Sequence, residues 1–235
     1  MAAELKPLAG GIIAAGDGTR LAERYPGLPK PLVPVGGRPL IAWAVGSLKA
    51  AGATRLTVLF NTRGDAARDW LKRNPQGLRI DFLRRDTASS WESFRLVSRT
   101  LARDAERFLV STTDTVMSPR DAERFAREAF RDGADAALAL TRFVDDEKPL
   151  WVDAVRGRVR AVGADAVRRD AVTCGVYALT ARTAGAMPAA AAHAKLRDFW
   201  TELVRSGAKV RGVLLADTVD VDRPEDVAVA EKMIT

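Results

Sequence analysis

The spacing of hydrophobic residues predicts strands and helices that alternate through the first half of the chain. Leu8–Ala15 is almost continuously apolar, which is typical of a buried strand. In Pro39–Ala51 the apolar side chains recur every three or four positions and Gly52 follows, so this segment is predicted to be a helix. The same patterns predict strands at Arg55–Phe60, Leu78–Leu83 and Arg107–Ser111, and helices at Asp65–Arg73, Ser89–Ala102 and Pro119–Arg131. Such alternation predicts an α/β fold with a mostly parallel central sheet between two layers of helices.

The second half of the chain departs from this simple alternation. Leu150–Val155 and Arg158–Val162 flank Arg156-Gly157 and therefore predict a hairpin. A closing helix is expected at Pro224–Met233, with Asp222 as its cap. The remaining patterns predict strands at Ala136–Leu140, Val172–Leu179 and Val210–Leu215, and a helix at Ala192–Ser206. We expect a single domain, residues 1–235, made of two halves at about 1–133 and 134–235.

Composition narrows the possible functions. A single cysteine, Cys174, excludes an internal disulfide, and a single histidine, His193, excludes a multi-histidine metal site. We expect His193 to be a surface or helix residue without a catalytic role. The formal charge is +7, but basic residues are interspersed with acidic ones and no nucleic-acid motif is present, so no nucleic-acid partner is predicted. No apolar run is long enough to span a membrane and no signal-peptide pattern opens the chain, so we expect a cytoplasmic location.

The stretch after the first strand combines glycines with two positive charges. It reads Ala-Ala-Gly-Asp-Gly-Thr-Arg-Leu and continues, after a short interval, as Pro-Lys-Pro-Leu-Val-Pro. Gly16 and Gly18 are expected to let main-chain N–H groups approach an anion closely, while Arg20 and Lys30 supply fixed charges. The prolines on both sides of Lys30 stiffen its backbone. The Walker and dinucleotide-binding patterns are absent, so the sequence predicts a different kind of triphosphate-binding loop.

Two segments supply candidate ligands for a metal ion. Asp114 follows an apolar strand, and Asp220 and Asp222 lie on one face of a segment predicted to be extended. Mg²⁺ commonly binds one or two protein carboxylates together with substrate phosphates. Asp114 could equally be a loop residue or the N-cap of a helix. Because Asp222 is also expected to cap a helix, Asp220 is the better candidate for the second metal ligand.

The two-part motif closely resembles the opening of the sugar-phosphate nucleotidyltransferases, also called nucleotide-sugar pyrophosphorylases. The resemblance implies a Rossmann-like α/β/α nucleotidyltransferase fold and transfer of a nucleotidyl group from an NTP to a phosphorylated small acceptor, with release of pyrophosphate. It implies that Arg20 holds the β- and γ-phosphates and that Lys30 lies near the α-phosphate. It also implies that Asp114 and Asp220 hold Mg²⁺, with Asp222 as a possible alternative ligand.

The resemblance further assigns the two substrate-binding surfaces. It implies nucleotide contacts from Ala14, Ala15, Gly16, Gly18, Thr19, Asn61, Thr87 and Ser90. It implies acceptor contacts from Trp151, Asp153, Thr173 and Gly175. Asn61 could equally be a turn residue at the end of a strand, and Trp151 could serve in packing.

Departures from the family pattern leave the substrates open. Arg84-Arg85-Asp86 stands where a glutamine is common, and Glu147-Lys148-Pro149 precedes the hairpin instead of following it. These changes resemble the small cytidylyltransferase branch, which uses phosphocholine or inositol phosphate, and the muramate-phosphate uridylyltransferases. CTP is therefore slightly favoured, with sugar-1-phosphate uridylyl or guanylyl transfer as the alternative. A metal-dependent glycosyltransferase, a non-catalytic nucleotide-sugar sensor and a nucleic-acid-binding module are the competing interpretations. The oligomeric state is left open.

Overall fold

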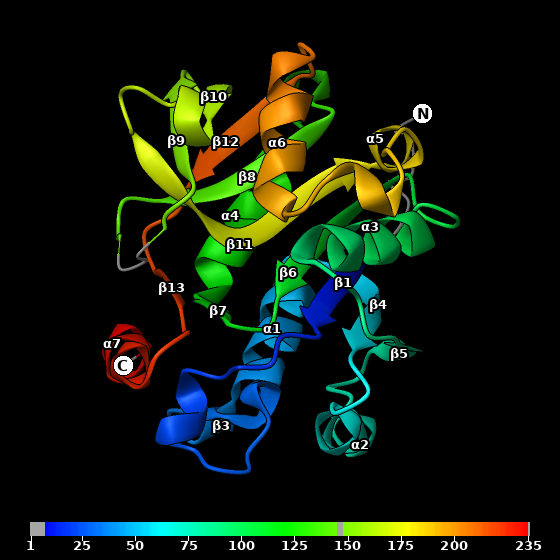
Figure 1. Cartoon of the computed structure of the whole chain (residues 1–235), viewed down its shortest axis with the longest axis vertical. Coiled ribbons are helices and arrows are strands. Elements are labelled where there is room, and N and C mark those ends of the chain that lie inside the picture. Colours follow the sequence, from blue (N-terminus) through cyan, green and yellow to red (C-terminus); the bar gives the residue numbers. More distant parts are fainter. Residues whose placement is uncertain (1–7, 145–147, 235) are drawn as a thin grey trace.

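A nine-stranded sheet forms the centre of the computed structural model, which describes residues 8–144 and 148–234. The strand order is β5-β4-β1-β6-β11-β8-β12-β10-β9 (Figure 1). The strands are β1 (Leu8–Ala14), β4 (Ala53–Phe60), β5 (Arg79–Arg84), β6 (Arg107–Thr112), β8 (Ala136–Thr141), β9 (Trp151–Val155), β10 (Arg158–Val162), β11 (Ala171–Thr180) and β12 (Val210–Leu214). The first four in the chain run parallel to one another, and β11 runs antiparallel to its neighbours β6 and β8.

Helices cover both faces of this sheet. One face carries α3 (Ser90–Leu101), α5 (Ala181–Gly185) and α6 (Leu196–Arg205), and the other carries α1 (Leu40–Ala50), α2 (Asp65–Arg73) and α4 (Pro119–Ala129). On the first face the rings of Trp91 and Phe199 stack with centroids 4.7 Å apart, and Phe94 contacts Trp200. Because apolar side chains leave both faces of the sheet, two separate cores form. The expected three-layer α/β arrangement is confirmed.

A third, smaller core lies beneath the closing helix α7 (Pro224–Met233). It is built on two short antiparallel ribbons that the hydrophobic pattern does not predict, because their strands have only two or three residues. One pairs β2 (Pro34–Val35) with β3 (Arg38–Pro39), and the other pairs β7 (Thr115–Met117) with β13 (Thr218–Asp220). This core packs the first loop, the segment after β6 and the C-terminal segment against one another.

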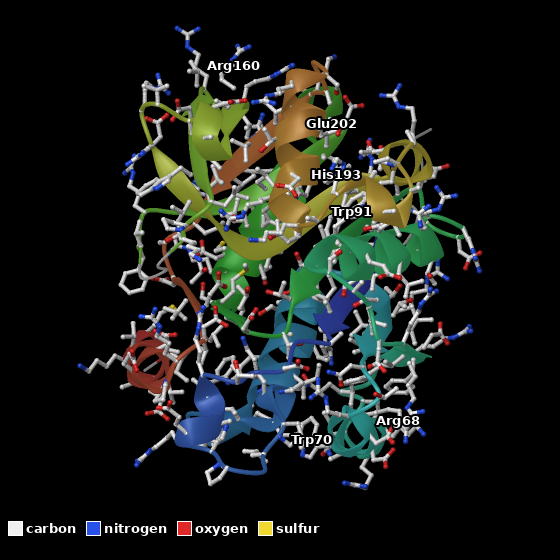
Figure 2. The ribbon with its side chains drawn as sticks, in the orientation of Figure 1. Arg68, Trp70, Trp91, Arg160, His193 and Glu202 are labelled. Atoms are coloured by element: carbon white, nitrogen blue, oxygen red, sulfur yellow. The ribbon has the colours of Figure 1, made fainter. Side chains whose placement is uncertain are left out.

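The predicted helix Ala192–Ser206 is wrong at its beginning. Residues Ala190–Ala192 form a short 3₁₀ turn, and α6 starts only at Leu196. His193 lies in the extended link between them, so it is not a helix residue, and its side chain is only 8% exposed. Figure 2 shows the ring beside Trp91, with a centroid separation of 5.0 Å, and its Nε2 lies 3.3 Å from Glu202. The alanine-rich stretch is typical of a helix, but packing of His193 against α3 prevails over that local preference.

The order of strands reverses at β1. The chain moves outward from β1 to β4 and β5, and then returns to place β6 on the other side of β1. In open α/β sheets the loops diverge at such a point, which leaves a crevice at the carboxyl ends of the strands. The loops after β1 and β6 are therefore expected to border the functional site. None of the helices in the described part of the chain combines the length and hydrophobicity needed to cross a membrane.

Candidate active site

The loops that follow β1 and β6 meet where the strand order reverses. Both the main-chain N–H and the hydroxyl of Thr113 donate to the carbonyl of Ile13, at 3.2 and 2.8 Å. These bonds join the ends of the two strands and leave Asp114 directly beside the first loop. The expectation that these two loops come together is confirmed.

A short ribbon brings the C-terminal carboxylates to the same place. β7 begins one residue after Asp114, and its Thr115 pairs with Asp220 at the end of β13. The hydroxyl of Thr115 donates to the Asp220 carboxylate at 2.6 Å, and the N–H of Val221 donates to the carbonyl of Asp114 at 2.9 Å. Residues about a hundred positions apart in the chain thus share one cleft.

Lys30 reaches into this cleft from the first loop. Its Nζ lies 2.6 Å from Asp114 and 2.5 Å from Asp222, and its side chain is only 9% exposed. Gly18 makes this position possible, since it has a φ of +62° and a Cβ there would lie 2.4 Å from the Cβ of Lys30. Gly16 behaves differently from expectation: its φ is not positive, and a Cβ would meet open space. The close approach of backbone and lysine therefore requires glycine at position 18.

The electrostatics of the cleft follow from this cluster of charges. Burial would lower the pKa of Lys30, but the charges of Asp114 and Asp222 outweigh it and raise that pKa above its usual value. Burial alone would raise the pKa of Asp114, whereas the Lys30 ammonium holds it below its usual value. The Lys30 ammonium also favours the ionised form of Asp220, but this effect is outweighed. Desolvation first, and then the charge of Asp114, raise the pKa of Asp220 above its usual range.

The donor set suits a hard divalent cation. The carboxylates of Asp114, Asp220 and Asp222 supply oxygen ligands, and the ammonium of Lys30 shows that a cation is accommodated between two of them. Within residues 8–144 and 148–234, no three histidine, cysteine or acidic side chains are grouped closely enough to hold a metal ion alone. Substrate phosphates would therefore have to complete the coordination, which is the usual situation for Mg²⁺.

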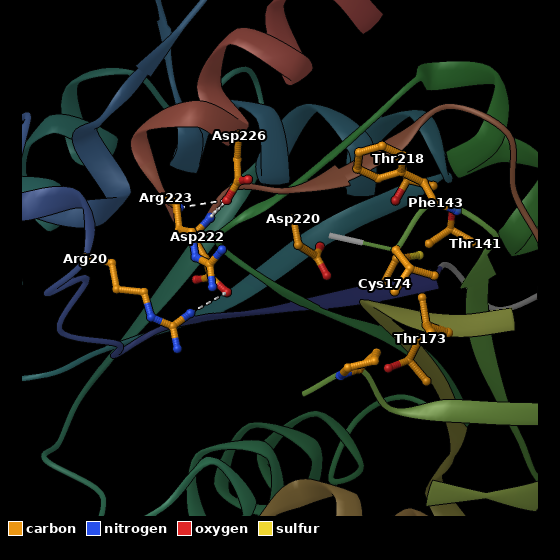
Figure 3. Close-up of a pocket in the computed structure, with 13 residues that line it drawn as sticks. Arg20, Thr141, Phe143, Thr173, Cys174, Thr218, Asp220, Asp222, Arg223 and Asp226 are labelled. Carbon is orange, nitrogen blue, oxygen red and sulfur yellow. Dashed lines mark hydrogen bonds and ion pairs between the residues drawn. The ribbon is translucent and has the colours of Figure 1, made fainter. Parts of the chain in front are cut away.

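Arg20 lies at the mouth of the cleft. Its Nη1 is 4.0 Å from Asp222 and its side chain is 53% exposed, so it is free to turn toward a ligand (Figure 3). Thr19 and Gly16 are exposed on the same loop. The predicted phosphate contacts from this loop remain predictions, and the open position of these residues is compatible with them.

Three of the residues expected to contact the nucleotide, Asn61, Thr87 and Ser90, are hydrogen-bonded within the protein. Asn61 donates to the carbonyl of Ala15 at 3.1 Å, and its own Oδ1 accepts the N–H of Arg63, so it supports the first loop as a turn residue would. The hydroxyl of Thr87 lies 2.5 Å from that of Ser93, and Ser90 accepts the N–H of Leu196 at the start of α6. Ala14 is buried. Direct nucleotide contacts from these side chains remain predictions.

The four residues predicted to bind the acceptor are in different situations. Both oxygens of Asp153 accept main-chain N–H groups, from Arg168 at 3.1 Å and Arg169 at 2.7 Å, and the side chain is buried. Asp153 therefore shapes the turn before β11, and an acceptor contact from its side chain remains a prediction. Trp151 is half-buried beneath the guanidinium of Arg169, 5.8 Å from its ring centre. Thr173 lines the cleft next to Cys174.

Gly175 has an unexpected role. It interrupts the β8–β11 register with a φ of +61°, and a Cβ there would lie 2.2 Å from the hydroxyl of Thr115 and 2.4 Å from that of Thr112. Thr115, which donates to Asp220, and its neighbour Thr112 therefore fit only against a glycine at position 175.

We expect Gly175→Ala to lower the free energy of unfolding by about 1–3 kcal/mol, because it adds both backbone strain and a clash. Urea unfolding followed by tryptophan fluorescence measures the change. The matched control is Gly185→Ala at the end of α5, where φ is not positive and a Cβ would meet open space. Equal stability of the two variants would contradict this account of Gly175.

The expectation that Asp222 caps the closing helix α7 is wrong. The residue at the N-cap of α7 is Arg223, and Asp226 accepts the N–H groups of both Asp222 and Arg223, at 2.8 and 2.7 Å. The carboxylate of Asp222 is directed to Lys30 instead. Asp121 on α4 has a similar supporting role, since it accepts the N–H groups of residues 216 and 217. The buried carboxylates of Asp121 and Asp226 thus fix the two ends of the segment that carries Asp220. Only Asp226 could be anticipated from the sequence, because it belongs to the Asp-Arg-Pro-Glu-Asp run at the start of the closing helix.

The chain matches a known family over most of its length. The family model described as "MobA-like NTP transferase domain" matches residues 10–200, which include the first loop, Lys30, Asp114 and most of the sheet.

Individual relatives are more distant. CMP-5'-(3-aminopropyl)phosphonate synthase of Streptomyces rubellomurinus is 30% identical over 161 residues, which are 60% of this chain and 25% of that protein. A mannose-1-phosphate guanyltransferase of Emericella nidulans is 31% identical over 140 residues, 58% of this chain and 38% of that protein. The chain therefore spans well under half the length of these curated relatives. The inositol-1-phosphate CTP transferase of T. maritima has a similar fold, with a TM-score of 0.82 at 20% identity, covering 98% of this chain and 97% of that one.

Proposed function

The chain belongs to the MobA-like NTP transferase family, and we propose that it transfers a nucleotidyl group from an NTP to a phosphorylated sugar or alcohol. An oxygen of the acceptor phosphate forms a bond to the α-phosphorus, and the bond from that phosphorus to the oxygen bridging to the β-phosphate breaks. Pyrophosphate leaves with the electron pair of the broken bond. The acceptor phosphate is already an anion near neutral pH, so no side chain has to remove a proton from it.

The observation that carries this proposal is the convergence of charges around Lys30. The lysine, Asp114 and the Asp220–Asp222 segment come from three remote parts of the chain and meet at the carboxyl ends of β1 and β6. Taking these charges out of water has a desolvation cost, and charge clusters of this kind are often found at functional sites. Its composition suits the phosphates and the metal ion of an NTP.

In the proposed mechanism the chain positions the phosphates and neutralises their charge. Arg20 turns from the cleft mouth to bind the β- and γ-phosphates. Lys30 leaves its carboxylate partners for the α-phosphate, where negative charge accumulates during transfer. Asp114 and Asp220 would hold Mg²⁺, which would supply positive charge to neutralise the phosphate oxygens. Because both reacting groups are anionic, this neutralisation and alignment account for catalysis without a general base.

We favour CTP as the nucleotide. The printed name of one relative describes attachment of CMP to an aminopropylphosphonate, and that of another describes guanylyl transfer to mannose 1-phosphate. The departures from the family pattern that resemble the cytidylyltransferase branch, among them the missing glutamine before Thr87, support CTP, with GTP and UTP as the alternatives.

A matrix of substrates tests the proposal. CTP, UTP, GTP and ATP are each combined with phosphorylated sugars, phosphorylated alcohols and phosphonates in the presence of Mg²⁺, and pyrophosphate release is measured. We expect release that requires both an acceptor and the metal ion. Nucleotide binding by calorimetry without pyrophosphate release for any pair would contradict the proposal and would favour a non-catalytic sensor.

A further inference from the structure

A small pocket continues from the charged cleft past Asp220. Its volume is about 70 Å³, room for roughly five water-sized groups. Figure 3 shows its two ends: Arg20, Asp222 and Arg223 gather on one side of Asp220, and Phe143 and Thr173 lie on the other. A substrate whose phosphate lies in the charged cleft would direct its remaining atoms toward the far end.

One wall at the far end of the pocket is apolar and is formed by Phe143, Val144, Pro149 and Val172. Phe143 and Val144 are 45% and 41% exposed, which is unusual for large apolar side chains in the described part of the chain. Apolar side chains exposed at the mouth of a pocket are typical of a surface that a ligand covers.

Among the described residues, the polar groups at this end of the pocket are the hydroxyls of Thr141, Thr173 and Thr218 and the thiol of Cys174. The hydroxyl of Thr141 accepts the N–H of Phe143 at 3.1 Å. The thiol of Cys174 is buried, and burial raises its pKa, so it remains neutral. A hexose brings several hydroxyl groups that each lose a hydrogen bond to water unless the site replaces it. Among the described residues, this end of the pocket offers only the three threonine hydroxyls and the thiol, which is fewer hydroxyl partners than a hexose requires.

We propose that the acceptor is a phosphate or phosphonate that carries a short aliphatic chain with few hydroxyl groups, and that Phe143 and Val144 select it. This inference rests on the proposed function, because it concerns the acceptor of that reaction. The phosphate or phosphonate oxygen attacks the α-phosphorus next to Asp220, and the chain extends along Phe143, Val144 and Pro149. Contact with these apolar groups stabilises the bound chain, whereas added hydroxyl groups are desolvated without compensation.

A second, larger pocket of about 660 Å³ could instead bind a sugar phosphate. It lies between α6 and the β9–β10 hairpin and includes polar side chains such as Arg197 and Thr201. Pro149 borders both pockets. A hexose phosphate would need this larger, polar space, so acceptor preference discriminates between the two pockets.

The test compares acceptors with the same carbon skeleton. n-Propyl phosphate and sn-glycerol 3-phosphate differ only in two hydroxyl groups, and glucose 1-phosphate represents the sugars. With the preferred NTP and Mg²⁺, we expect kcat/KM to be roughly 10- to 100-fold higher for n-propyl phosphate than for glycerol phosphate. Equal or higher values for glycerol phosphate or glucose 1-phosphate would overturn the inference and leave the proposed function standing. Absence of pyrophosphate release with every acceptor would instead overturn the proposed function.

A matched pair of variants tests whether the apolar wall of the pocket causes the preference for n-propyl phosphate. Val144 and Val155 are 41% and 40% exposed, but only Val144 lines the pocket. We expect Val144→Asn to lower kcat/KM for n-propyl phosphate about tenfold with little change for glycerol phosphate, and Val155→Asn to change neither. Because both side chains are largely exposed, neither change should reduce the melting temperature appreciably. An unchanged n-propyl phosphate preference in both Val144→Asn and Phe143→Asn would overturn the assignment.

Discussion

Replacing Lys30 with alanine is expected to reduce nucleotidyl transfer by about 10³-fold or more, since the charge next to the α-phosphate is lost. The same change should also destabilise the protein. Lys30 is almost fully buried and is bonded to both Asp114 and Asp222. Removing one partner of a buried ion pair leaves uncompensated charge, which costs about 3 kcal/mol here because Asp222 remains half exposed.

Stability measurements without substrate separate these two effects. Urea unfolding of Lys30→Ala in EDTA should give a lower free energy of unfolding than the wild type, and added Mg²⁺ should restore more of it than in the wild type. The reason is that a divalent cation replaces the missing ammonium between the carboxylates. Lys72→Ala is the matched control, because Lys72 is exposed on α2 and its ion pair with Asp69 is long, at 3.9 Å. Normal stability together with normal activity in Lys30→Ala would contradict the assigned role.

Features encoded by neighbouring residues could be predicted from the sequence. The strand, glycine turn and Pro-Lys-Pro run form one continuous stretch, and Asp114 directly follows an apolar strand. The alternation of strands and helices also depends on local periodicity, so the layered fold could be inferred from it. The parallel first half of the sheet agrees with that expectation, whereas β11 enters antiparallel between β6 and β8, which local patterns do not specify.

Features that depend on remote contacts could not be predicted in the same way. Asp222 precedes Pro224 like a helix cap, yet its carboxylate is bound by a lysine 192 positions earlier. Gly175 is identified as a glycine that the fold requires only when Thr112 and Thr115 are placed beside it. His193 leaves the predicted helix because its ring packs on Trp91 from a distant segment. In each case tertiary packing prevails over the local signal.

Asp220→Asn is expected to slow transfer strongly while leaving the substrate-free protein at least as stable as the wild type. Desolvation within the cleft, and then the nearby charge of Asp114, disfavour the ionised carboxylate of Asp220, although the residue is exposed at the cleft surface and the Lys30 ammonium offsets part of this effect. Asparagine removes this repulsion, and its side-chain oxygen can still accept the hydroxyl hydrogen bond from Thr115. The variant should lose about 10²- to 10³-fold in kcat because one ligand for Mg²⁺ is lost.

Comparison with Asp222→Asn decides which of the two aspartates is the second metal ligand. Asp222 contacts Lys30, so its amide variant should lose stability through the weakened ion pair and should keep more of the Mg²⁺ dependence of turnover. Asp217→Asn, three residues before Asp220 and exposed, is the control for the substitution itself. Pyrophosphate release titrated with Mg²⁺ and urea unfolding in EDTA provide the two readouts. If Asp222→Asn shows the larger loss of Mg²⁺ dependence and Asp220→Asn the larger loss of stability, the two roles must be exchanged, and the cleft would hold its metal ion on the side of Arg20.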